Sequence, residues 1–432
     1  MPRTPSKPPT KPNLGASDTY GDDVAPAIAM EGRVRGGQGA GQPGSTTTTT
    51  GEQMSAAESE QIGVEEFRAE AAGWLAAHRS EAPREYGAIL PPDLAPEGRA
   101  WQRTIFDAGF AGIHWPTEFG GRGLTPEHNA AWITECALAQ VPPFLNMVGC
   151  VLTGGALLAF GTPEQQAEHL RTIITGERIW CQLFSEPDAG SDLAGLSTRA
   201  VRDGDEFVVD GQKVWCSNGR VADRGILMAR TDPDAPPHKG ISFFLVDMAS
   251  PGIELRPLRQ MNGDAEFDEV FLTGVRLPAD SLLGPLNEGW MVGMSALTNE
   301  RGYIGASGIS LKRRLDSMLA MGRRPDGSSL DPLEQQDLAE LWIRGTALWA
   351  MGRRQGPVAS VLGSVAKLGT TELMFDTAVL RSDLAGPEAM LEGDAAYGLL
   401  SAPGARIAGG TSQIQRNIIG ERILGLPKEP KV

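Results

Sequence analysis

The sequence is poor in the residues that form covalent or metal-based cross-links. Among 432 residues there are four cysteines, and their spacing matches neither a disulfide framework nor a metal-ligand set: Cys136, Cys150, Cys181 and Cys216. The five histidines are scattered, and no two are three or four residues apart. We therefore expect a reduced, cytoplasmic protein without a structural metal.

Long apolar runs and excess positive charge are absent as well. No uninterrupted apolar run approaches the ~20 residues of a membrane span. The first 15 residues contain three basic side chains but five prolines and no apolar stretch, so they do not form a secretory signal. The net charge of −15 argues against a nucleic-acid backbone as partner, although a local basic patch can still bind a small anion.

The remaining composition is that of a globular protein with a tail. Apolar residues make up 41% and charged residues 22% of the chain, and 432 residues suffice for a sizeable core. Residues 1–60 are rich in Pro, Gly, Ser and Thr, and they bury too little apolar surface to offset their ordering entropy. We expect a disordered tail there; alternatively, Met54 is the working translation start.

Three regions follow the tail. Residues 61–177 show helical periodicity, and Thr125-Pro126 and Thr162-Pro163 are each typical of a helix N-terminus, the second with Gln165 at the capping-box position. Residues 178–285 contain short segments rich in β-branched and aromatic residues, which predict strands. Residues 286–432 are helical again, and positions 360–375 predict an ordinary packed helix. The fold class is therefore α+β, with a β-domain between two helical domains.

The strand-rich region opens with the stretch from Trp180 to Asn218. Two Asp-Gly pairs, Asp203-Gly204 and Asp210-Gly211, predict hairpin turns with positive φ. Residues 185–192 form a loop of small residues, in which Gly190 and Ser191 leave the backbone N–H groups free to face a ligand.

Three motifs in this order resemble those of the acyl-CoA dehydrogenase family. They are Glu-Pro-Asp-Ala-Gly-Ser-Asp (186–192), Gly-Gln-Lys-Val-Trp-Cys-Ser-Asn (211–218) and Gly-Gly-Thr-Ser-Gln-Ile-Gln-Arg (409–416), with a weaker match at Trp-Pro-Thr-Glu-Phe-Gly-Gly (115–121). The resemblance covers roughly residues 62–428. It implies a flavoprotein with a helical domain, a small β-barrel and a C-terminal helical bundle.

The resemblance also implies where FAD and the substrate bind. The residues that it places at FAD are Phe184, Ser185, Gly190, Trp215, Ser217, Thr411 and Gln413. Trp215 would pack on the flavin face, the Ser217 hydroxyl would bond N5, and Ser191 would lie where the CoA pantetheine enters. The alternative from the residues alone is that Trp215 is a core tryptophan and Ser217 a turn residue.

The reaction implied is α,β-dehydrogenation of an acyl-CoA thioester, in which a carboxylate removes the α-proton. Many family members carry this base immediately before Gly-Thr-Ser, where this chain has Gly409. Glycine accepts no proton, although its N–H could still bond the thioester carbonyl. A second branch, which includes isovaleryl- and long-chain-type enzymes, carries the base in a Glu-Arg pair on the first long C-terminal helix. Here Glu300-Arg301 matches, and Glu300 lies on an otherwise apolar helix stripe.

Partners and substrate are less defined by the sequence. The segments 321–325 and 378–382 do not match those that bind a neighbouring subunit's FAD in homotetrameric members, so a homodimer, a homotetramer and a mixed tetramer with a related subunit remain open. The resemblance implies an electron-transferring flavoprotein as electron acceptor and a role in fatty acid metabolism such as β-oxidation. Small residues at Gly293 and Ala296 would permit a bulky acyl group, and a base on this helix is compatible with branched, long or polycyclic acyl chains alike.

Two other functions are compatible with the same motifs. One is a base-deficient partner subunit of a heteromeric acyl-CoA dehydrogenase, which the glycine at position 409 would explain. The other is a flavin oxidase or monooxygenase on the same fold, which depends on oxygen access to the flavin. Resemblance at the level of the fold does not separate these functions.

Overall fold

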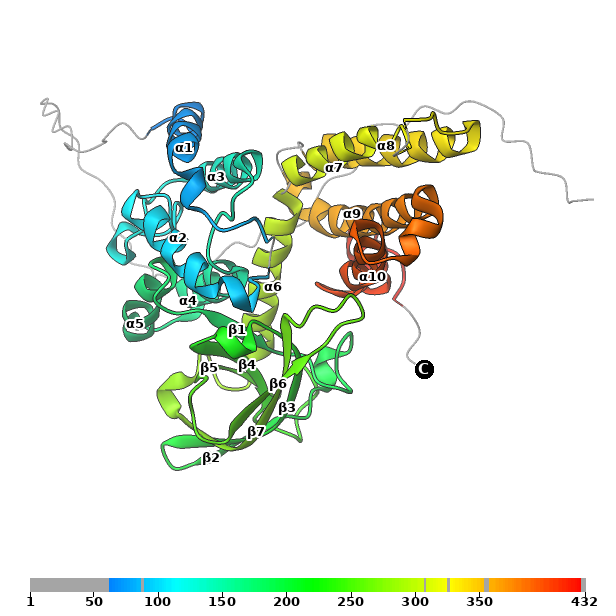
Figure 1. Cartoon of the computed structure of the whole chain (residues 1–432). Helices are drawn as coiled ribbons and strands as arrows, with labels where there is room; N and C mark the ends of the chain where they lie inside the picture. Colours follow the sequence, from blue (N-terminus) through cyan, green and yellow to red (C-terminus); the bar gives the residue numbers. More distant parts are fainter. Residues whose placement is uncertain (1–61, 87–88, 307, 325–326, 353–356, 429–432) are drawn as a thin grey trace, which may run out of the picture. The chain divides into compact units, whose positions relative to one another are not determined.

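A computed structural model describes residues 62–86, 89–306, 308–324, 327–352 and 357–428, without the side chains of residues 299–306, 308–310, 312–314 and 357–361. The predicted disordered tail, residues 1–60, lies outside this part of the chain. Figure 1 shows the described chain as helices, then strands, then helices, which confirms the predicted α+β order. No described helix is long and apolar enough to cross a membrane.

The first helices form around an aromatic core. They are α1 (Val64–His78), α2 (Ala95–Asp107), α3 (Pro126–Ala139), α4 (Gly154–Phe160) and α5 (Pro163–Ile174), with a π-helix at Val148–Thr153 before α4. The Phe110 and Trp132 rings stack with centroids 4.8 Å apart, and both side chains are buried. The α5 capping box is confirmed, since Thr162 N–H donates to Gln165 Oε1 at 3.1 Å.

Seven strands form one sheet that curls around its own apolar core (Figure 1). They are β1 (Trp180–Leu183), β2 (Arg199–Asp203), β3 (Glu206–Ser217), β4 (Arg224–Arg230), β5 (Ile241–Asp247), β6 (Ile253–Leu258) and β7 (Phe267–Pro278). The order is β1-β4-β2-β3-β7-β6, with β5 paired to β4. The long antiparallel β3–β7 pair carries two register shifts, at Val209/Gly211 and at Lys213/Cys216.

One of the two predicted hairpin turns is wrong. Gly204 has φ +65° between β2 and β3, as expected for a turn. Asp210-Gly211 instead lies inside β3, at the first register shift against β7. Gly211 is required by close approach, because a Cβ there would lie 2.3 Å from Thr198 Oγ1. The Asp-Gly pair therefore marks a bulge, in which glycine serves packing rather than chain reversal.

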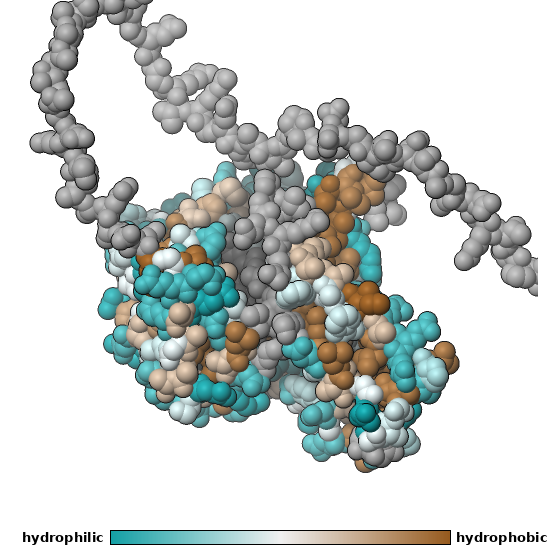
Figure 2. Space-filling view, turned by 90° about the horizontal axis from the view of Figure 1, so that it is seen from above, coloured by the Kyte–Doolittle hydropathy of each residue, from teal (hydrophilic) through white to brown (hydrophobic). Residues whose placement is uncertain are grey.

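The C-terminal helices are α6 (Gly289–Ala306), α7 (Gly308–Ala320), α8 (Pro332–Gly352), α9 (Pro357–Ala385), α10 (Asp394–Ile407) and α11 (Ser412–Ile418). The core shared by α7, α8 and α9 contains Leu315, Leu341 and Leu373. Several apolar side chains on these helices or just after them are exposed, among them Leu333, Ile343, Ile407, Leu424 and Leu426. Figure 2 shows brown, apolar surface over this part of the molecule.

Candidate active site

The strand β1 and the middle of β3 are joined where two of the sequence motifs meet. Lys213 Nζ donates to the Phe184 carbonyl oxygen at 2.9 Å, and Val214 N–H donates to the Ser185 carbonyl oxygen at 2.9 Å. Phe184 is buried and packs edge-to-face on Phe243. The structure therefore brings Phe184 and Ser185 next to the segment that carries Trp215 and Ser217.

A buried ion pair holds this junction. Lys213 Nζ lies 2.8 Å from Glu186 Oε1, and both side chains are buried. The Glu186 carboxylate also accepts hydrogen bonds from Ser197 N–H, Ser197 Oγ and Thr198 N–H, at 2.6, 2.8 and 2.9 Å. The burial of the charges is thus offset by direct pairing and by hydrogen bonds to both carboxylate oxygens.

The two partners respond differently to burial. Burial raises the pKa of Glu186, but the charge and hydrogen bond of Lys213, with the hydrogen bonds from Thr198 and Ser197, lower it to about 2. Burial also lowers the pKa of Lys213 below its ordinary value, and the Glu186 carboxylate opposes that shift. We infer that Glu186 is ionised at neutral pH and holds Lys213 charged. Sequence reasoning gave neither residue a role, although a lysine on the inward face of a strand was a usable signal.

Trp215 is not a core residue. The second register shift of β3 lies at this point, and Trp215 has φ +59°, a strained value for a tryptophan. Its side chain is 57% exposed and contacts Phe267 edge-to-face at 5.9 Å. Ser217 ends the strand, paired in register with Phe267. The bulge therefore presents a large aromatic ring to a ligand, two residues before the Ser217 hydroxyl.

The loop after β1 leaves its tip open. Glu186 and Ala189 exchange two backbone hydrogen bonds, of 3.0 and 3.1 Å, which close a tight turn. Gly190 and Ser191 are exposed beyond it, and a Cβ on Gly190 would meet no atom within 4 Å. The accessibility predicted for this loop is therefore present in the structure.

The C-terminal motif is a turn that leads into α11. Gly409 and Gly410 both have positive φ, +63° and +88°. Thr411 Oγ1 accepts from Ile414 N–H at 3.2 Å as the N-cap of α11, and Gln413 is exposed. No described residue accepts a hydrogen bond from the Gly409 N–H. That N–H is therefore available to a ligand.

Three side chains to which the sequence analysis gave no role, those of Lys367, Gln415 and Glu372, bind this turn. Lys367 Nζ donates to the Gly410 carbonyl at 2.7 Å, Gln415 Nε2 to the Gly409 carbonyl at 3.0 Å, and Ser412 Oγ to Glu372 at 2.6 Å. The expected ordinary packed helix thus includes a lysine, 2% exposed, that positions the turn. A lysine and a glutamate at 367 and 372 in an apolar helix were the signal.

Replacing Gly410 with alanine tests this geometry. A Cβ at Gly410 would lie 2.7 Å from Gln415 Nε2, at a φ that favours glycine. We expect the variant to lose about 1–3 kcal/mol of unfolding free energy, measured by urea denaturation. The matched control is Gly404→Ala in α10, where the added methyl meets no atom within 4 Å and is expected to be neutral or stabilising. Equal effects of the two substitutions would contradict the strain at Gly410.

The helix predicted to carry the catalytic base is present. Glu300 and Arg301 lie within α6, but their side chains are outside the described residues. The room predicted beside Gly293 is not there, because a Cβ on that residue would lie 2.8 Å from Met228 Sδ. Ala296 is likewise buried, with no exposed surface. Small residues at these positions serve close packing of α6, so the expected substrate space lies elsewhere.

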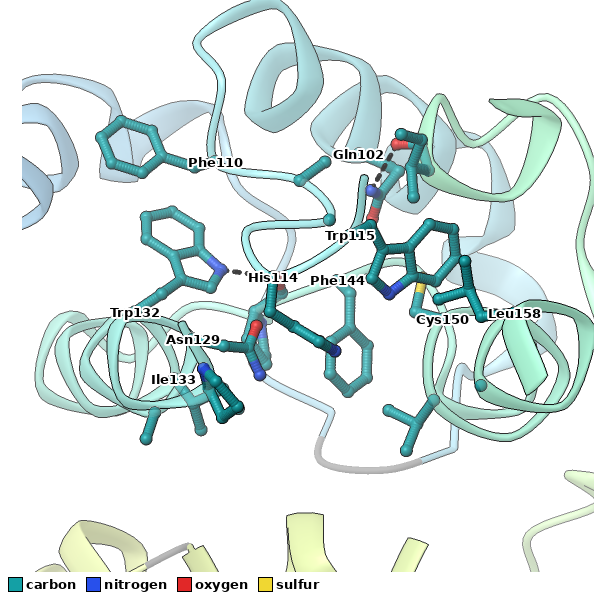
Figure 3. Close-up of a pocket in the computed structure, with 18 of the residues that line it drawn as sticks. Gln102, Phe110, His114, Trp115, Asn129, Trp132, Ile133, Phe144, Cys150 and Leu158 are labelled. Atoms are coloured by element: carbon teal, nitrogen blue, oxygen red, sulfur yellow. Dashed lines mark hydrogen bonds between the residues drawn. The ribbon is translucent and has the colours of Figure 1, made fainter. Parts of the chain in front are cut away.

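A cavity of about 710 Å³ provides space on another side of α6. It lies among α3, α4, the π-helix and the loop at residues 110–115 (Figure 3). Ser295 and Thr298 of α6 also line it. Both α6 residues precede Glu300 by less than two helical turns. The cavity is thus built mainly by the N-terminal helices and reaches the helix that carries the candidate base.

Comparison with known proteins is consistent with this arrangement. Family models of acyl-CoA dehydrogenase match throughout the chain: the N-terminal domain at residues 59–177, the middle domain at 181–275 and the C-terminal domain at 287–424. The chain belongs to the acyl-CoA dehydrogenase family. Members of this family are flavoproteins, and the chain is an oxidoreductase of this type. The recognised family and its three-part fold are therefore confirmed.

This acyl-CoA dehydrogenase resembles other proteins both in sequence and in structure. It is 38% identical over 383 residues to acyl-CoA dehydrogenase IpdE1 of Mycobacterium tuberculosis, covering 85% of this chain and 99% of that protein. The solved Tcur3481-Tcur3483 steroid ACAD has a TM-score of 0.72 at 27% identity, covering 85% and 98%. The ChsE4-ChsE5 complex from Mycobacterium tuberculosis has a TM-score of 0.67 at 27% identity, covering 87% and 100%.

Proposed function

We propose that this acyl-CoA dehydrogenase binds FAD and converts a bulky acyl-CoA to the 2-enoyl-CoA, with Glu300 removing the α-proton. The observation that carries the proposal is the junction of β1 and β3. Hydrogen bonds from Lys213 and Val214 to the Phe184 and Ser185 carbonyls join the two segments that the family uses for flavin. The exposed ring of Trp215 adjoins that junction.

The residues present fit a flavin. Trp215 offers a large exposed aromatic face, which a planar ring system would cover. Ser217 is half-buried, and its hydroxyl has no hydrogen-bond partner among the described residues. FAD, when bound, supplies the acceptor for the β-hydride. Phe184, Ser185, Gly190, Thr411 and Gln413 are the further contacts that we assign to it.

The groups that we assign to removal of the α-proton lie on α6 and in the turn at Gly409. Glu300 is the carboxylate that we assign as base, with Arg301 beside it as a substrate-side partner. The Gly409 N–H, which is free among the described residues, would donate to the thioester carbonyl and stabilise charge that develops on its oxygen. Ser191, on the exposed loop tip, would border the CoA pantetheine.

We further propose a mixed tetramer with a second family member, with an electron-transferring flavoprotein as electron acceptor. Two structural relatives are two-component assemblies, the Tcur3481-Tcur3483 and ChsE4-ChsE5 proteins. The segments that would bind a neighbouring subunit's FAD do not match those of homotetrameric members. Exposed apolar side chains such as Leu333, Ile343 and Leu424 would be covered by a partner (Figure 2). The mass of the native assembly distinguishes this from a homodimer or homotetramer.

Anaerobic mixing of the FAD-loaded protein with straight-chain, branched and polycyclic acyl-CoA thioesters tests the function. We expect bleaching of the flavin absorbance, fastest with a ring-bearing acyl group. Flavin that no thioester bleaches would contradict the dehydrogenase activity. Bleaching that needs a related subunit and survives Glu300→Gln in this chain would assign the base to that subunit, the second candidate that Gly409 favours.

A further inference from the structure

The cavity beside α6 has a neutral, largely apolar lining. Its walls include the side chains of Phe110, Trp115, Trp132 and Phe144, as Figure 3 shows. No aspartate, glutamate, lysine or arginine of the described residues lines it. Its volume, about 710 Å³, is in the range of small-molecule sites. Such a cavity excludes charged ligands and favours an uncharged apolar one.

One polar group in this wall has no partner. Trp115 is 2% exposed, yet no described residue accepts a hydrogen bond from its Nε1–H. The neighbouring indole of Trp132, by contrast, donates to the Pro143 carbonyl at 2.9 Å. Figure 3 shows the Trp115 ring nitrogen on the side of the cavity that Phe144 also lines. Because this nitrogen is reached from the cavity and no described residue pairs with it, the geometry leaves room there for an acceptor on a ligand.

The packing of α4 keeps the Trp115 ring in this orientation. Gly154 is the first residue of α4, directly after the π-helix, and a Cβ there would lie 2.2 Å from Trp115 Cζ2. The benzene edge of the indole therefore fills the place of a side chain. Its Nε1 edge cannot turn into the helix to find a partner, so the donor is built into the wall.

A second polar group lies nearby. His114 precedes Trp115, and the side chain of Asn129 of α3 lines the cavity beside it (Figure 3). Part of the His114 ring is accessible, but the surrounding protein removes enough water to lower the pKa of His114 below 6.5. The imidazole is therefore neutral at pH 7, and it can donate or accept without bringing a charge into the cavity.

We propose that the cavity binds a ring system carrying a neutral oxygen, a ketone or hydroxyl, which accepts from Trp115 Nε1 and contacts the His114–Asn129 pair. A single unbranched chain would leave much of the cavity empty and forfeit contacts with the aromatic walls. As a statement about the acyl group, this inference rests on the proposed acyl-CoA dehydrogenation. As a statement about the cavity, it stands without that activity.

Calorimetric titration of 2-decalone into the FAD-loaded protein, in its native assembly, tests the site. The wild type is expected to bind this bicyclic ketone, and Trp115→Phe, which keeps an aromatic ring but removes the N–H, to bind it about tenfold more weakly. The matched control is Trp132→Phe in the same wall, whose N–H is already paired within the protein, and its ketone affinity should change less than twofold. His114→Phe, at an accessible position, should weaken binding severalfold even if Trp115→Phe folds poorly.

The CoA thioesters of decalin-2-carboxylic acid and of its 6-oxo counterpart then link the site to catalysis. The ratio of their dissociation constants should favour the ketone in the wild type and approach one in Trp115→Phe. No ketone binding by the wild type, or equal weakening in Trp115→Phe and Trp132→Phe, overturns the inference. Ketone binding that depends on Trp115, without flavin bleaching by any thioester, overturns the proposed function and leaves the oxygen site intact.

Discussion

Glu300→Gln is expected to slow flavin reduction by acyl-CoA by about 10³-fold or more while FAD and the thioester still bind. Glutamine keeps the size and much of the hydrogen bonding of the side chain but accepts no proton. Removing a positioned general base typically costs 10²–10⁴-fold in rate, and a weakly acidic C–H needs the base at the upper end of that range. Anaerobic stopped-flow absorbance of the flavin measures the rate.

A matched substitution separates loss of the base from damage to α6. Glu288, an exposed residue directly before the helix, can be changed to glutamine with little expected effect on the rate. Reduction that survives unchanged in Glu300→Gln would refute the assignment of the base. It would also direct attention to a partner subunit, because Gly409 offers only a backbone N–H.

Lys213→Met is expected to destabilise the protein by about 3–5 kcal/mol, because it leaves the buried Glu186 carboxylate without its counterion. The same substitution releases the Phe184 carbonyl, to which Lys213 donates at 2.9 Å. Bound flavin should therefore be lost more easily than from a variant of equal stability with an intact pair. Chemical denaturation gives the free energy, and flavin fluorescence on dilution gives the release.

The double variant Glu186→Gln/Lys213→Met should cost less than Lys213→Met alone, because no unpaired charge stays buried. The free energy of unfolding measured at acid pH gives an independent test. Since the folded-state pKa of Glu186 is about 2, below its ordinary 4.5, its contribution is complete above pH 4.5 and is lost as the pH falls toward 2. The stability difference between wild type and Glu186→Gln should shrink over that window. A difference independent of pH would show that the charge of Glu186 is not what stabilises the junction.

Local signals predicted the elements well because they depend on neighbouring residues. The capping box at Thr162 and Gln165 acts within one helical turn, and the strands rich in β-branched residues need no distant partner to be recognised. Gly211 was misinterpreted for the opposite reason. Its requirement comes from Thr198, which lies on a neighbouring segment of the sheet and is invisible to a local pattern.

The sequence by itself determined the order of helices and strands and the family, because periodicity, caps and the three motifs are properties of short segments. Only the tertiary structure decided how those segments are used. It turned Trp215 outward at a bulge, filled the space beside Gly293 with Met228, and buried Lys213 against Glu186. The tertiary structure likewise decided where the cavity lies and that the Trp115 N–H faces it. Each of these depends on which side chain arrives from a distant segment, and a local pattern, even a lysine on the inward face of a strand, does not identify that partner.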